Sequence, residues 1–600
     1  MSSTFGGLNT VVRGLFAQQM SLDTVGHNIS NANTDGYSRQ RVNLVTSNPQ
    51  TLYAGIGQVQ LGTGVVTESI TRARDTFVDQ QMWKESSTLG YGQTLQDSLG
   101  KIEGVFMEPT ETGMQTVLNK FWEALNTLST NGSDNGARSA LRERGVELVD
   151  TIQQANKQLR NMVSDMNSVV GLRVETINQI TSEMVSLNKQ ITAVEVGKID
   201  HANDLRDRRD YLVDQLSSII NVRVTEDQVG NYIVQSSGVL LVDGQSNYKL
   251  STKSSIDPDY NYEVVSVTES TGVTINFTDG ELKGLLASRD DQTSGVKGYL
   301  DKLSNMSQFL LQEFNAVQRS GYGSDNSTGY NFFGVSGNAS TSDYSVTGNY
   351  AAIFGTTTPK SYQWIDSLKV NDDLFNPVDG TAKIAAKTMA GSVQITQSNA
   401  AGGKIAFGGK YTGSLASVSY QVRLTANTAG AITGIEYSTD NGTSWNTSIE
   451  VTPATTPKTF SIGNGVTVQI GTQASNANGD TYNFSMPQGI AAGDNAVNLA
   501  NRLKVDISEL LGKSSLDTFY ASFIGALGIQ RQSATRLTDN QKALVSQITN
   551  SRESVSGVNM DEEMSNMIRF QKGYNAAARI LTSMDEMLDK LINGTGVVGR

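Results

Sequence analysis

The stretch MIRFQKGYNAAARILTSMDEMLDKLI, residues 567–592, carries the strongest pattern in the sequence. Apolar or aromatic residues recur in it at alternating spacings of three and four, without a gap. This pattern places its members on one face of an α-helix. The sequence therefore predicts an amphipathic helix over about Met560–Ile592, ended by Asn593 and Gly594. Its stripe consists of Met567, Phe570, Tyr574, Ala577, Leu581, Met584, Leu588 and Leu591.

A second stripe lies at the other end of the chain, over about Thr4–Ile29. Six of its seven positions are apolar, and Gln18 is the exception. The run NISNANTDG, residues 28–36, follows with residues that stop helices and form turns. A helix at a chain terminus has adjoining sequence on one side only. The simplest partner for each terminal stripe is therefore the other terminus or another subunit. The apolar positions are Leu8, Val11, Leu15, Leu22, Val25 and Ile29.

A third stripe runs through residues 149–194, where twelve of fourteen positions are apolar and Asn156 and Arg173 are not. It predicts a rod roughly 70 Å long, which Gly171 can bend. Such a helix can form a soluble coiled-coil dimer or pack within its own domain. The two polar positions and the helices around it favour packing within the domain. Further helices are expected at Thr112–Thr130, Asn203–Ile220, Gly295–Arg319, Ile490–Gly512 and Thr518–Ser554.

Two regions have the alternation typical of strands. Residues 222–277 predict short strands with glycine turns, and residues 341–487 predict a β-rich insert between helical flanks. The expected fold class is α+β with three parts. Residues 1–65 and 555–600 form a terminal coiled-coil pair. Residues 66–340 and 488–554 form a helical bundle with a small β part, and residues 341–487 form the inserted outer domain.

The composition excludes several classes of function. The chain of 600 residues has a net charge of -12, so neither nucleic acid nor an anionic membrane is an expected partner. It has no cysteine, which excludes disulfides and thiolate chemistry. Its two histidines, His27 and His201, lie outside any HExxH or GxSxG pattern. We therefore expect no catalytic, cofactor or metal site.

The N-terminal residues MSSTFGGLNTVVRGLF lack the charged and apolar segments of a secretory signal, and no run of 18 apolar residues exists. On these grounds alone the chain is expected in the cytoplasm, unless an uncleaved signal exports it. The acidic segment Asn203–Asp210 can be a carboxylate-rich metal loop or a solvated helix. Its alternating charges favour the solvated, salt-bridged helix.

The sequence motifs resemble those of the axial proteins of the bacterial flagellum. Residues 28–37, NISNANTDGY, resemble the N-terminal signature of the rod and hook family around ANTxGY, in which Tyr37 would anchor the chain that follows. Residues 570–579 and 584–593 resemble the matching C-terminal helix.

Internal blocks resemble the hook-associated branch of this family, and the resemblance covers roughly residues 1–335 and 490–600. One departure is Gln318, where the family pattern leads us to expect His, which puts local packing in doubt. The blocks are residues 121–129 with 137–141, residues 203–210 with Leu212, Leu216 and Ser217, and residues 280–290.

The resemblance implies a structural protein without enzymatic activity, exported unfolded through the flagellar type III apparatus without a cleaved signal. It implies a ring of identical subunits at the distal end of the hook, outside the cell, joining hook to filament. The implied partners are the subunit itself, hook protein, a second junction protein and an export chaperone. The implied assembly interface is the two terminal stripes, which would line the central channel, together with Tyr37.

Two alternatives stay open at this point. The chain can be another axial protein, of the hook, distal-rod or flagellin type, although residues 203–210 and 280–290 argue against this. The insert, residues 341–487, can also carry an enzyme or an adhesin. It has no histidine and no cysteine, which argues against catalysis but does not exclude glycan binding.

Overall fold

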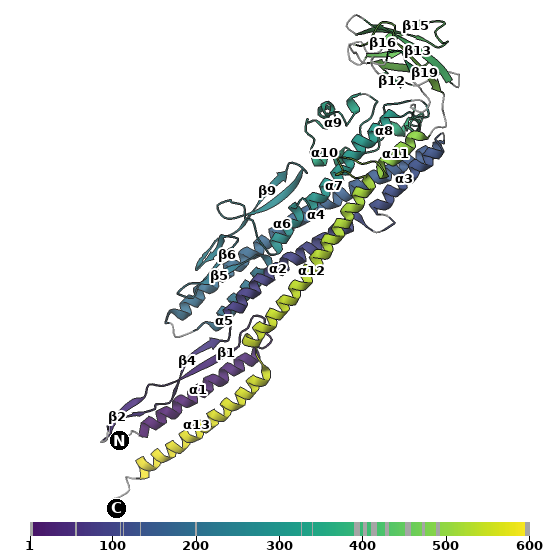
Figure 1. The fold of residues 1–600 in the computed structure, drawn as a ribbon. Helices are drawn as coiled ribbons and strands as arrows, with labels where there is room; N and C mark the ends of the chain where they lie inside the picture. The colour runs from purple at the N-terminus through teal and green to yellow at the C-terminus, as the bar shows by residue number, and fades with distance from the viewer. Residues whose placement is uncertain are drawn as a thin grey trace, which may run out of the picture.

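A computed structural model describes residues 4–54, 57–108, 110–111, 113–132, 134–197, 201–325, 327–338, 340–388, 396–399, 405–409, 417–426, 431–450, 458–470, 475–487 and 493–594. The molecule is elongated, with the two terminal helices at one end and a β-rich lobe at the other (Figure 1). A long helical body lies between them. The α+β class and the pairing of the terminal helices are both confirmed.

The terminal part consists of two long helices and a β ribbon. Helix α1 (Thr4–Ser30) packs on α13 (Met560–Gly594), and both agree with the helices expected from the stripes. Strands β1 (Gln40–Thr46) and β4 (Val65–Arg72) pair antiparallel and also pack on α1. They continue into the hairpin of β2 (Gln50–Ala54) and β3 (Gly57–Leu61).

The body is built around α4, a single helix from Asn135 to Val194 that continues unbroken through Gly171 and buries the predicted stripe except Arg173 and Val194. One long helix of the body, α2, has no counterpart among the expected elements. The expected helix at Gly295–Arg319 is interrupted by a π-helical segment, Leu310–Phe314. The other body helices are α2 (Thr76–Phe106), α3 (Met114–Thr130), α5 (Asn203–Ile219), α6 (Glu281–Asp290), α7 (Val296–Phe309), α8 (Asn315–Ser320), α11 (Asp494–Lys504) and α12 (Leu516–Ser556).

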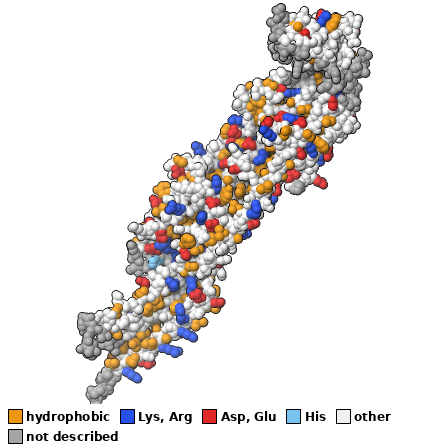
Figure 2. All heavy atoms as spheres, in the orientation of Figure 1, with side chains coloured by type: hydrophobic (Ala, Val, Ile, Leu, Met, Phe, Trp, Pro, Cys, Tyr) orange, Lys and Arg blue, Asp and Glu red, His pale blue; other side chains and the backbone are white. Residues whose placement is uncertain are grey.

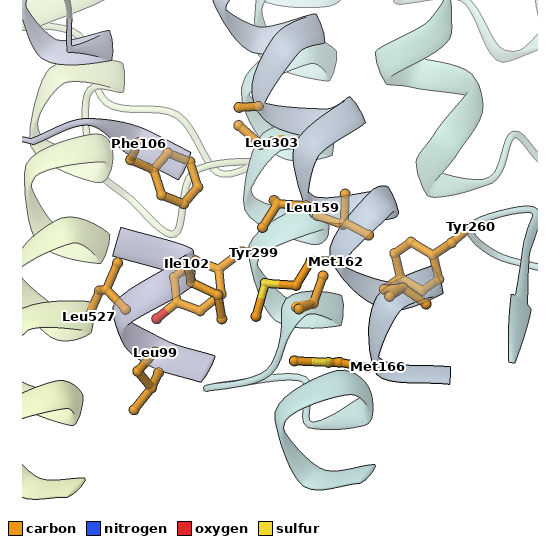
Figure 3. Packing of buried hydrophobic residues seen from close by; sticks show 14 of the residues in the cluster. Leu99, Ile102, Phe106, Leu159, Met162, Met166, Tyr260, Tyr299, Leu303 and Leu527 are labelled. Atoms are coloured by element: carbon orange, nitrogen blue, oxygen red, sulfur yellow. The ribbon is translucent and has the colours of Figure 1, made fainter. Parts of the chain in front are cut away.

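One continuous apolar core runs along this body. Side chains from α2, α4, α7 and α12 meet in it (Figure 3). At its upper end the rings of Phe121, Phe314, Phe332 and Phe333 pack with centroids 4.8 to 5.9 Å apart. Each fully buried side chain of this kind contributes about 1.5–3 kcal/mol relative to exposure, so the body can be stable without a partner.

Short strands cover one flank of the body, as the alternation in residues 222–277 predicts. A four-stranded antiparallel sheet contains β5 (Arg223–Glu226), β6 (Tyr232–Ser236), β7 (Val239–Asp243) and β8 (Ser246–Asn247). A separate hairpin consists of β9 (Ser251–Asp257) and β10 (Tyr262–Thr268), and β10 packs on α4.

The β-rich lobe is a pair of antiparallel sheets with its own core, which includes Tyr420, Val468 and Phe484. One sheet has the order β11-β19-β13-β14-β15, and the other has the order β12-β18-β17-β16. The strands are β11 (Thr396–Gln397), β12 (Ile405–Gly409), β13 (Ser417–Ala426), β14 (Ile432–Ser438), β15 (Asn446–Thr447), β16 (Ile449–Glu450), β17 (Lys458–Ser461), β18 (Val466–Ile470) and β19 (Thr481–Pro487).

The segment before the lobe packs with the body and not with the lobe. Tyr344, Trp364 and Ile384 belong to the long apolar core, and the segment includes α9 (Tyr350–Phe354) and α10 (Ser361–Asp366). We therefore propose that the insert begins after Thr388 and not at residue 341. The other expected domain boundaries stay predictions.

Candidate assembly interface

The terminal helices are only half covered. In α13 every stripe position from Met567 to Leu588 is half-buried, and Leu591 is 56% exposed. In α1, Val25 is buried, whereas Leu8, Val11, Leu15, Leu22 and Ile29 are half-buried. Two glycines allow the helices to approach closely: a Cβ on Gly7 would lie 2.7 Å from Met584 Cε, and one on Gly573 would lie 2.8 Å from Gln18 Oε1. The predicted stripes therefore meet, but the pair leaves much of them open to solvent.

Further apolar side chains on these two helices are exposed to solvent and lie outside the predicted stripes. Phe16 on α1 is the most exposed of those on that helix, at 64%. Orange patches between blue side chains mark the lower end of the molecule (Figure 2). The exposed apolar residues outside the stripes are Phe16, Met20, Met560, Met564, Ile568, Ile580, Met587 and Ile592.

Besides Val25, the buried residues of α1 are small or polar: Ala17, Ser21, Thr24 and Asn28. The hydroxyls of Ser21 and Thr24 donate to the backbone carbonyls four residues earlier, at 2.8 Å each. Because three of these four side chains are polar and the fourth is only a methyl group, hydrophobic periodicity cannot identify their face. Sequence reasoning therefore missed it.

The motif at residues 28–37 closes the end of α1. Asn28 Nδ2 donates to the Gln40 carbonyl (2.9 Å) and to Glu563 Oε2 (3.1 Å). Asn28 Oδ1 accepts from the Gln40 amide (2.9 Å) and from the Tyr37 hydroxyl (2.8 Å). The Tyr37 side chain is half-buried, and its hydroxyl also lies 3.1 Å from His27 Nδ1, so it ties the turn to α1. One buried amide thus joins α1, the first strand and the C-terminal helix.

The segment after this motif docks on α5. The Ser38 amide donates to Asp207 Oδ2 at 2.9 Å, and Gln40 Nε2 donates to Asp204 Oδ1 at 2.7 Å. Gly36 has φ +78°, and a Cβ there would lie 2.8 Å from Tyr211 Cβ. Two motifs that are separated by about 170 residues of sequence therefore form one contact between the terminal part and the body.

Buried arginines complete this contact. Arg72 Nη1 lies 2.7 Å from both Asp207 Oδ1 and Asp210 Oδ2. Arg74 pairs with Asp79 (2.6 Å) and Asp210 (3.2 Å). These side chains are buried or nearly so, and breaking such a pair from one side costs about 3–5 kcal/mol.

The body helices extend the same cluster. Arg552 at the end of α12 pairs with Asp79 Oδ1 (2.9 Å) and Asp214 Oδ2 (2.8 Å). Trp83 Nε1 donates to Asp214 Oδ1 at 2.7 Å. We call Arg72, Arg74, Asp79, Asp207, Asp210, Asp214 and Arg552 the joint cluster. Sequence patterns point only to Asp207 and Asp210, because the partners lie far away along the chain.

Burial and charge act against each other in the joint cluster. Burial raises the pKa of Asp207 above its ordinary value, and Arg72 offsets only part of this effect. Burial also acts to raise the pKa of Asp210, but Arg74 and Arg72 outweigh it and hold that pKa below its ordinary value. Burial, and then the charges of Asp204 and Asp207, raise the pKa of Tyr37 far above its usual range, so its hydroxyl keeps its proton.

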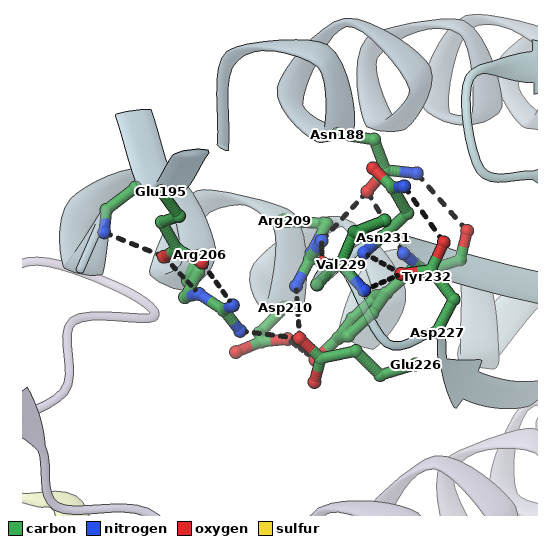
Figure 4. A network of polar contacts seen from close by, with 12 residues as sticks. Asn188, Glu195, Arg206, Arg209, Asp210, Glu226, Asp227, Val229, Asn231 and Tyr232 are labelled. Carbon is green, nitrogen blue, oxygen red and sulfur yellow. Dashed lines mark hydrogen bonds and ion pairs between the residues drawn. The ribbon is translucent and has the colours of Figure 1, made fainter. Parts of the chain in front are cut away.

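The segment Asn203–Asp210 is the salt-bridged helix that its charges predict, but the prediction that it is solvated is wrong for several members. Asp207, Arg209 and Asp210 are buried. Arg209 lies 3.5 Å from the centroid of the Tyr232 ring and donates to Asn188 Oδ1 at 2.8 Å (Figure 4). Charge alternation cannot distinguish a solvated helix from one that pairs its charges in the interior.

Among the described residues, no group of three or more His, Cys, Asp or Glu side chains could hold a metal ion. Within the same residues, no helix is long and apolar enough to cross a membrane.

Comparisons with known proteins identify the family. Residues 99–333 match the model of the flagellar hook-associated protein FlgK helical domain. Residues 8–37 match the flagella basal body rod protein model, and residues 550–594 match the C-terminal model of flagellar basal body rod FlgEFG proteins.

Full-length relatives extend this match. Flagellar hook-associated protein 1 of Bacillus subtilis is 31% identical over all of both chains, and that of Escherichia coli is 28% identical over 98% of this chain and 99% of its own. The solved structure of the flagellar hook junction protein FlgK from Burkholderia pseudomallei shares the fold, with TM-score 0.53 and 20% identity over 80% of this chain and all of its own. The chain therefore belongs to the flagellar hook-associated protein 1 family, a family of structural, non-enzymatic components of the flagellum outside the cell.

Proposed function

We propose that this chain forms a ring of identical subunits at the distal end of the hook and joins hook to filament. The family assignment supports a place in the flagellar axis, and the solved relative from Burkholderia pseudomallei is named as a flagellar hook junction protein. The observation that carries the proposal is the half-covered surface of the terminal helices.

That surface needs neighbours. Helix α13 packs on α1, and α1 also packs on β1 and β4, so the remaining sides of both helices face solvent. Exposed apolar patches of this kind mark interaction surfaces. Neighbouring subunits would cover Ile580, Met587 and Leu591, and each side chain removed from water would contribute about 1.5–3 kcal/mol.

The shape of the molecule gives the subunit an orientation. The terminal helices and the β-rich lobe lie at opposite ends of the long body (Figure 1). In a ring, the terminal helices would line the central channel and the lobe would face outward. The proposed interface consists of the two stripes and Tyr37, together with the exposed apolar residues that flank the stripes, such as Ile580 and Met587.

The proposed partners are further copies of this chain, hook protein and a second hook–filament junction protein. An export chaperone and the flagellar type III apparatus would act before assembly, on the unfolded chain. The net charge of -12 gives no attraction to nucleic acid or an anionic membrane, and we propose neither as a partner. Glycan binding by the insert stays a prediction from the sequence.

The test compares two double variants in a strain that lacks the native gene. Ile580→Glu with Met587→Glu places two charges on the exposed apolar surface of α13. Asn575→Glu with Ser583→Glu adds the same charge at exposed polar positions of the same helix. We expect filament growth to be lost with the first pair and kept with the second, with both proteins exported. Normal filaments with the first pair would contradict this interface.

A further inference from the structure

The hairpin β9–β10 is regular along its whole length. All seven residues of β9 pair with β10 without a bulge, from Ser251↔Thr268 to Asp257↔Tyr262. Ser251 to Ile256 are exposed, and β9 lies on the flank of the body away from α12 (Figure 1). Strand β9 therefore forms an edge of the molecule.

The contacts of β10 show which backbone groups of β9 point away from the hairpin. In an antiparallel ladder a residue directs its N–H and C=O to the same side, and successive residues alternate. The Val265 amide donates to Asn167 Oδ1 (3.2 Å), and its carbonyl accepts from Arg289 Nη1 (2.7 Å), so Val265 faces away from β9. Its cross-strand partner, Ser254, therefore faces away from β10.

Thr252 and Ile256, two residues before and after Ser254, also direct their backbone groups away from β10. The Glu263 carbonyl accepts from Asn167 at 2.6 Å, and the Val267 carbonyl accepts from the Ile275 amide at 2.8 Å. Their partners across the ladder are Ile256 and Thr252. Thr252, Ser254 and Ile256 thus direct three N–H and three C=O groups to the free edge, and no described residue bonds them.

The opposite side of the hairpin is fixed firmly to the body. Asn167 of α4 uses its side-chain amide as a substitute for a neighbouring strand, and the buried Arg289 donates to both Asn167 and Val265. At the hairpin tip, Arg160 donates to the Tyr260 carbonyl at 3.1 Å and to the Asn261 carbonyl at 2.8 Å. Arg289 belongs to the family block 280–290, whose role the terminal interface does not explain.

A free strand edge that is held rigidly can accept hydrogen bonds from, and donate them to, an added strand. Exposed edges are normally blunted by proline, bulges, charged side chains (lysine above all) or short length. Strand β9 has no proline and no bulge, and Lys253 is its one basic residue. Because its conformation is already fixed, an added strand would not have to order it first.

We propose that the free edge of β9 binds an extended segment of another polypeptide by strand addition. The segment would form hydrogen bonds with Thr252, Ser254 and Ile256. An apolar residue would lie beside Ile256, which is 69% exposed, and an acidic residue on the other face would lie beside Lys253. This rests on the proposed function, since a neighbouring subunit of the axial structure would supply the segment.

The experiment uses full-length chain with Ser254→Pro, and Ser254→Ala as its matched control. Both variants remove the hydroxyl that donates to Glu263, but only proline removes the outward N–H. In the monomer, hydrogen exchange at Lys253 and Ser255, whose amides face β10, should be the same in both variants. Equal exchange would show that the hairpin still forms.

In isolated hook–filament junctions, we expect the amides of Thr252, Ser254 and Ile256 in the unmodified chain to exchange about tenfold or more slower than in the monomer. Ser254→Pro should reduce incorporation of the chain into junctions, and Ser254→Ala should not. Fast exchange at these three amides in junctions that contain the chain would overturn strand addition at β9 and leave the proposed function intact. Absence of the chain from junctions would overturn the proposed function and this inference with it.

Discussion

Asn28 and Glu563, near opposite ends of the chain, are joined by a hydrogen bond of 3.1 Å from Asn28 Nδ2 to Glu563 Oε2. Both side chains are almost completely buried. Arg39 Nε lies 2.8 Å from the other Glu563 oxygen, so the buried carboxylate is paired. The two terminal helices are thus held together at the base of the pair, where the terminal part meets the body.

Replacing Asn28 with Ala should weaken this base. The Gln40 amide and carbonyl and one oxygen of Glu563 would lose their partner, and each buried polar group left unpaired costs about 1–3 kcal/mol. We expect the free energy of opening at the Gln40 amide, measured by hydrogen exchange, to fall by about 2 kcal/mol or more. Asn33→Ala, at an exposed position of the same turn, is the control. Unchanged exchange at Gln40 would contradict the role assigned to Asn28.

Gly36→Ala tests the contact between the N-terminal motif and α5. Gly36 has φ +78°, and an added Cβ would meet Tyr211 at 2.8 Å. Gly238 has a similar φ of +84° with nothing within 4 Å, so Gly238→Ala carries the backbone cost alone. We expect Gly36→Ala to lower the free energy of unfolding in urea by about 1–3 kcal/mol more than Gly238→Ala, because it also forces an overpacked contact. Equal losses would mean that Tyr211 moves aside freely.

The joint cluster should make stability depend on pH in two opposite ways. The folded-state pKa of Asp210 lies below its ordinary value, so its ionised form adds stability above about pH 4. This stability is lost as pH falls through the folded pKa. The folded-state pKa of Asp207 is raised, so Asp207 stabilises most at low pH and loses that contribution as pH rises through its folded pKa.

Asp210→Asn should therefore reduce the loss of stability between about pH 6 and pH 3, whereas Asp207→Asn should increase it. At neutral pH, Asp210→Asn should be less stable than the unmodified chain, since it leaves Arg72 and Arg74 incompletely paired. Asp207→Asn should lose less stability, because burial already disfavours the charge of Asp207. Urea unfolding at a series of pH values measures this, with exposed Asp150→Asn as the control. The same pH slope in all variants would show that the cluster does not control acid stability.

Sequence patterns identify long apolar stripes well and fail where packing uses other chemistry. They do not predict helix α2, because its buried face includes Ser87, Gly90 and Gly92 in place of an apolar stripe. Gly90 is required by contact, since a Cβ there would lie 2.2 Å from the Ser218 carbonyl oxygen. The joint cluster escapes prediction for a related reason: Arg72 and Arg552 are ordinary surface residues by composition, and only the fold gives them buried partners.

The insert should be removable. Its two connections leave the body side by side, because the Thr388 amide donates to Asp494 Oδ1 at 2.8 Å. The lobe has its own apolar core. We expect a chain in which a short Gly-Ser linker replaces residues 389–492 to be exported and to support motility nearly as well as the full chain. Loss of swimming with a stable, exported protein would show that the lobe is part of the junction contact.

The terminal helices should be largely disordered in the free monomer and should fold on assembly. Ordering each residue costs about 1–2 kcal/mol of backbone entropy. Burial of an apolar side chain stabilises the helix by about 1.5–3 kcal/mol only when the side chain is fully covered. Along α13 the stripe from Met567 to Leu588 is only half-buried against α1, so its burial does not offset the loss of backbone entropy. Gly14 and Gly26 weaken α1 further, by about 1 kcal/mol each relative to alanine.

Hydrogen exchange on the purified monomer tests this balance. We expect rapid exchange across Leu8–Ile29 and Met567–Leu591, and strong protection across Val149–Val194, whose stripe lies in the core of the body. Protection should appear in the terminal segments once subunits assemble, because neighbours then cover the open sides of both helices. The hydrogen bond between Asn28 and Glu563 lies next to the body, so residual protection should decrease from that end toward the chain termini. Strong, uniform protection of both helices in a verified monomer would show that the pair is stable alone, and that assembly docks a folded surface.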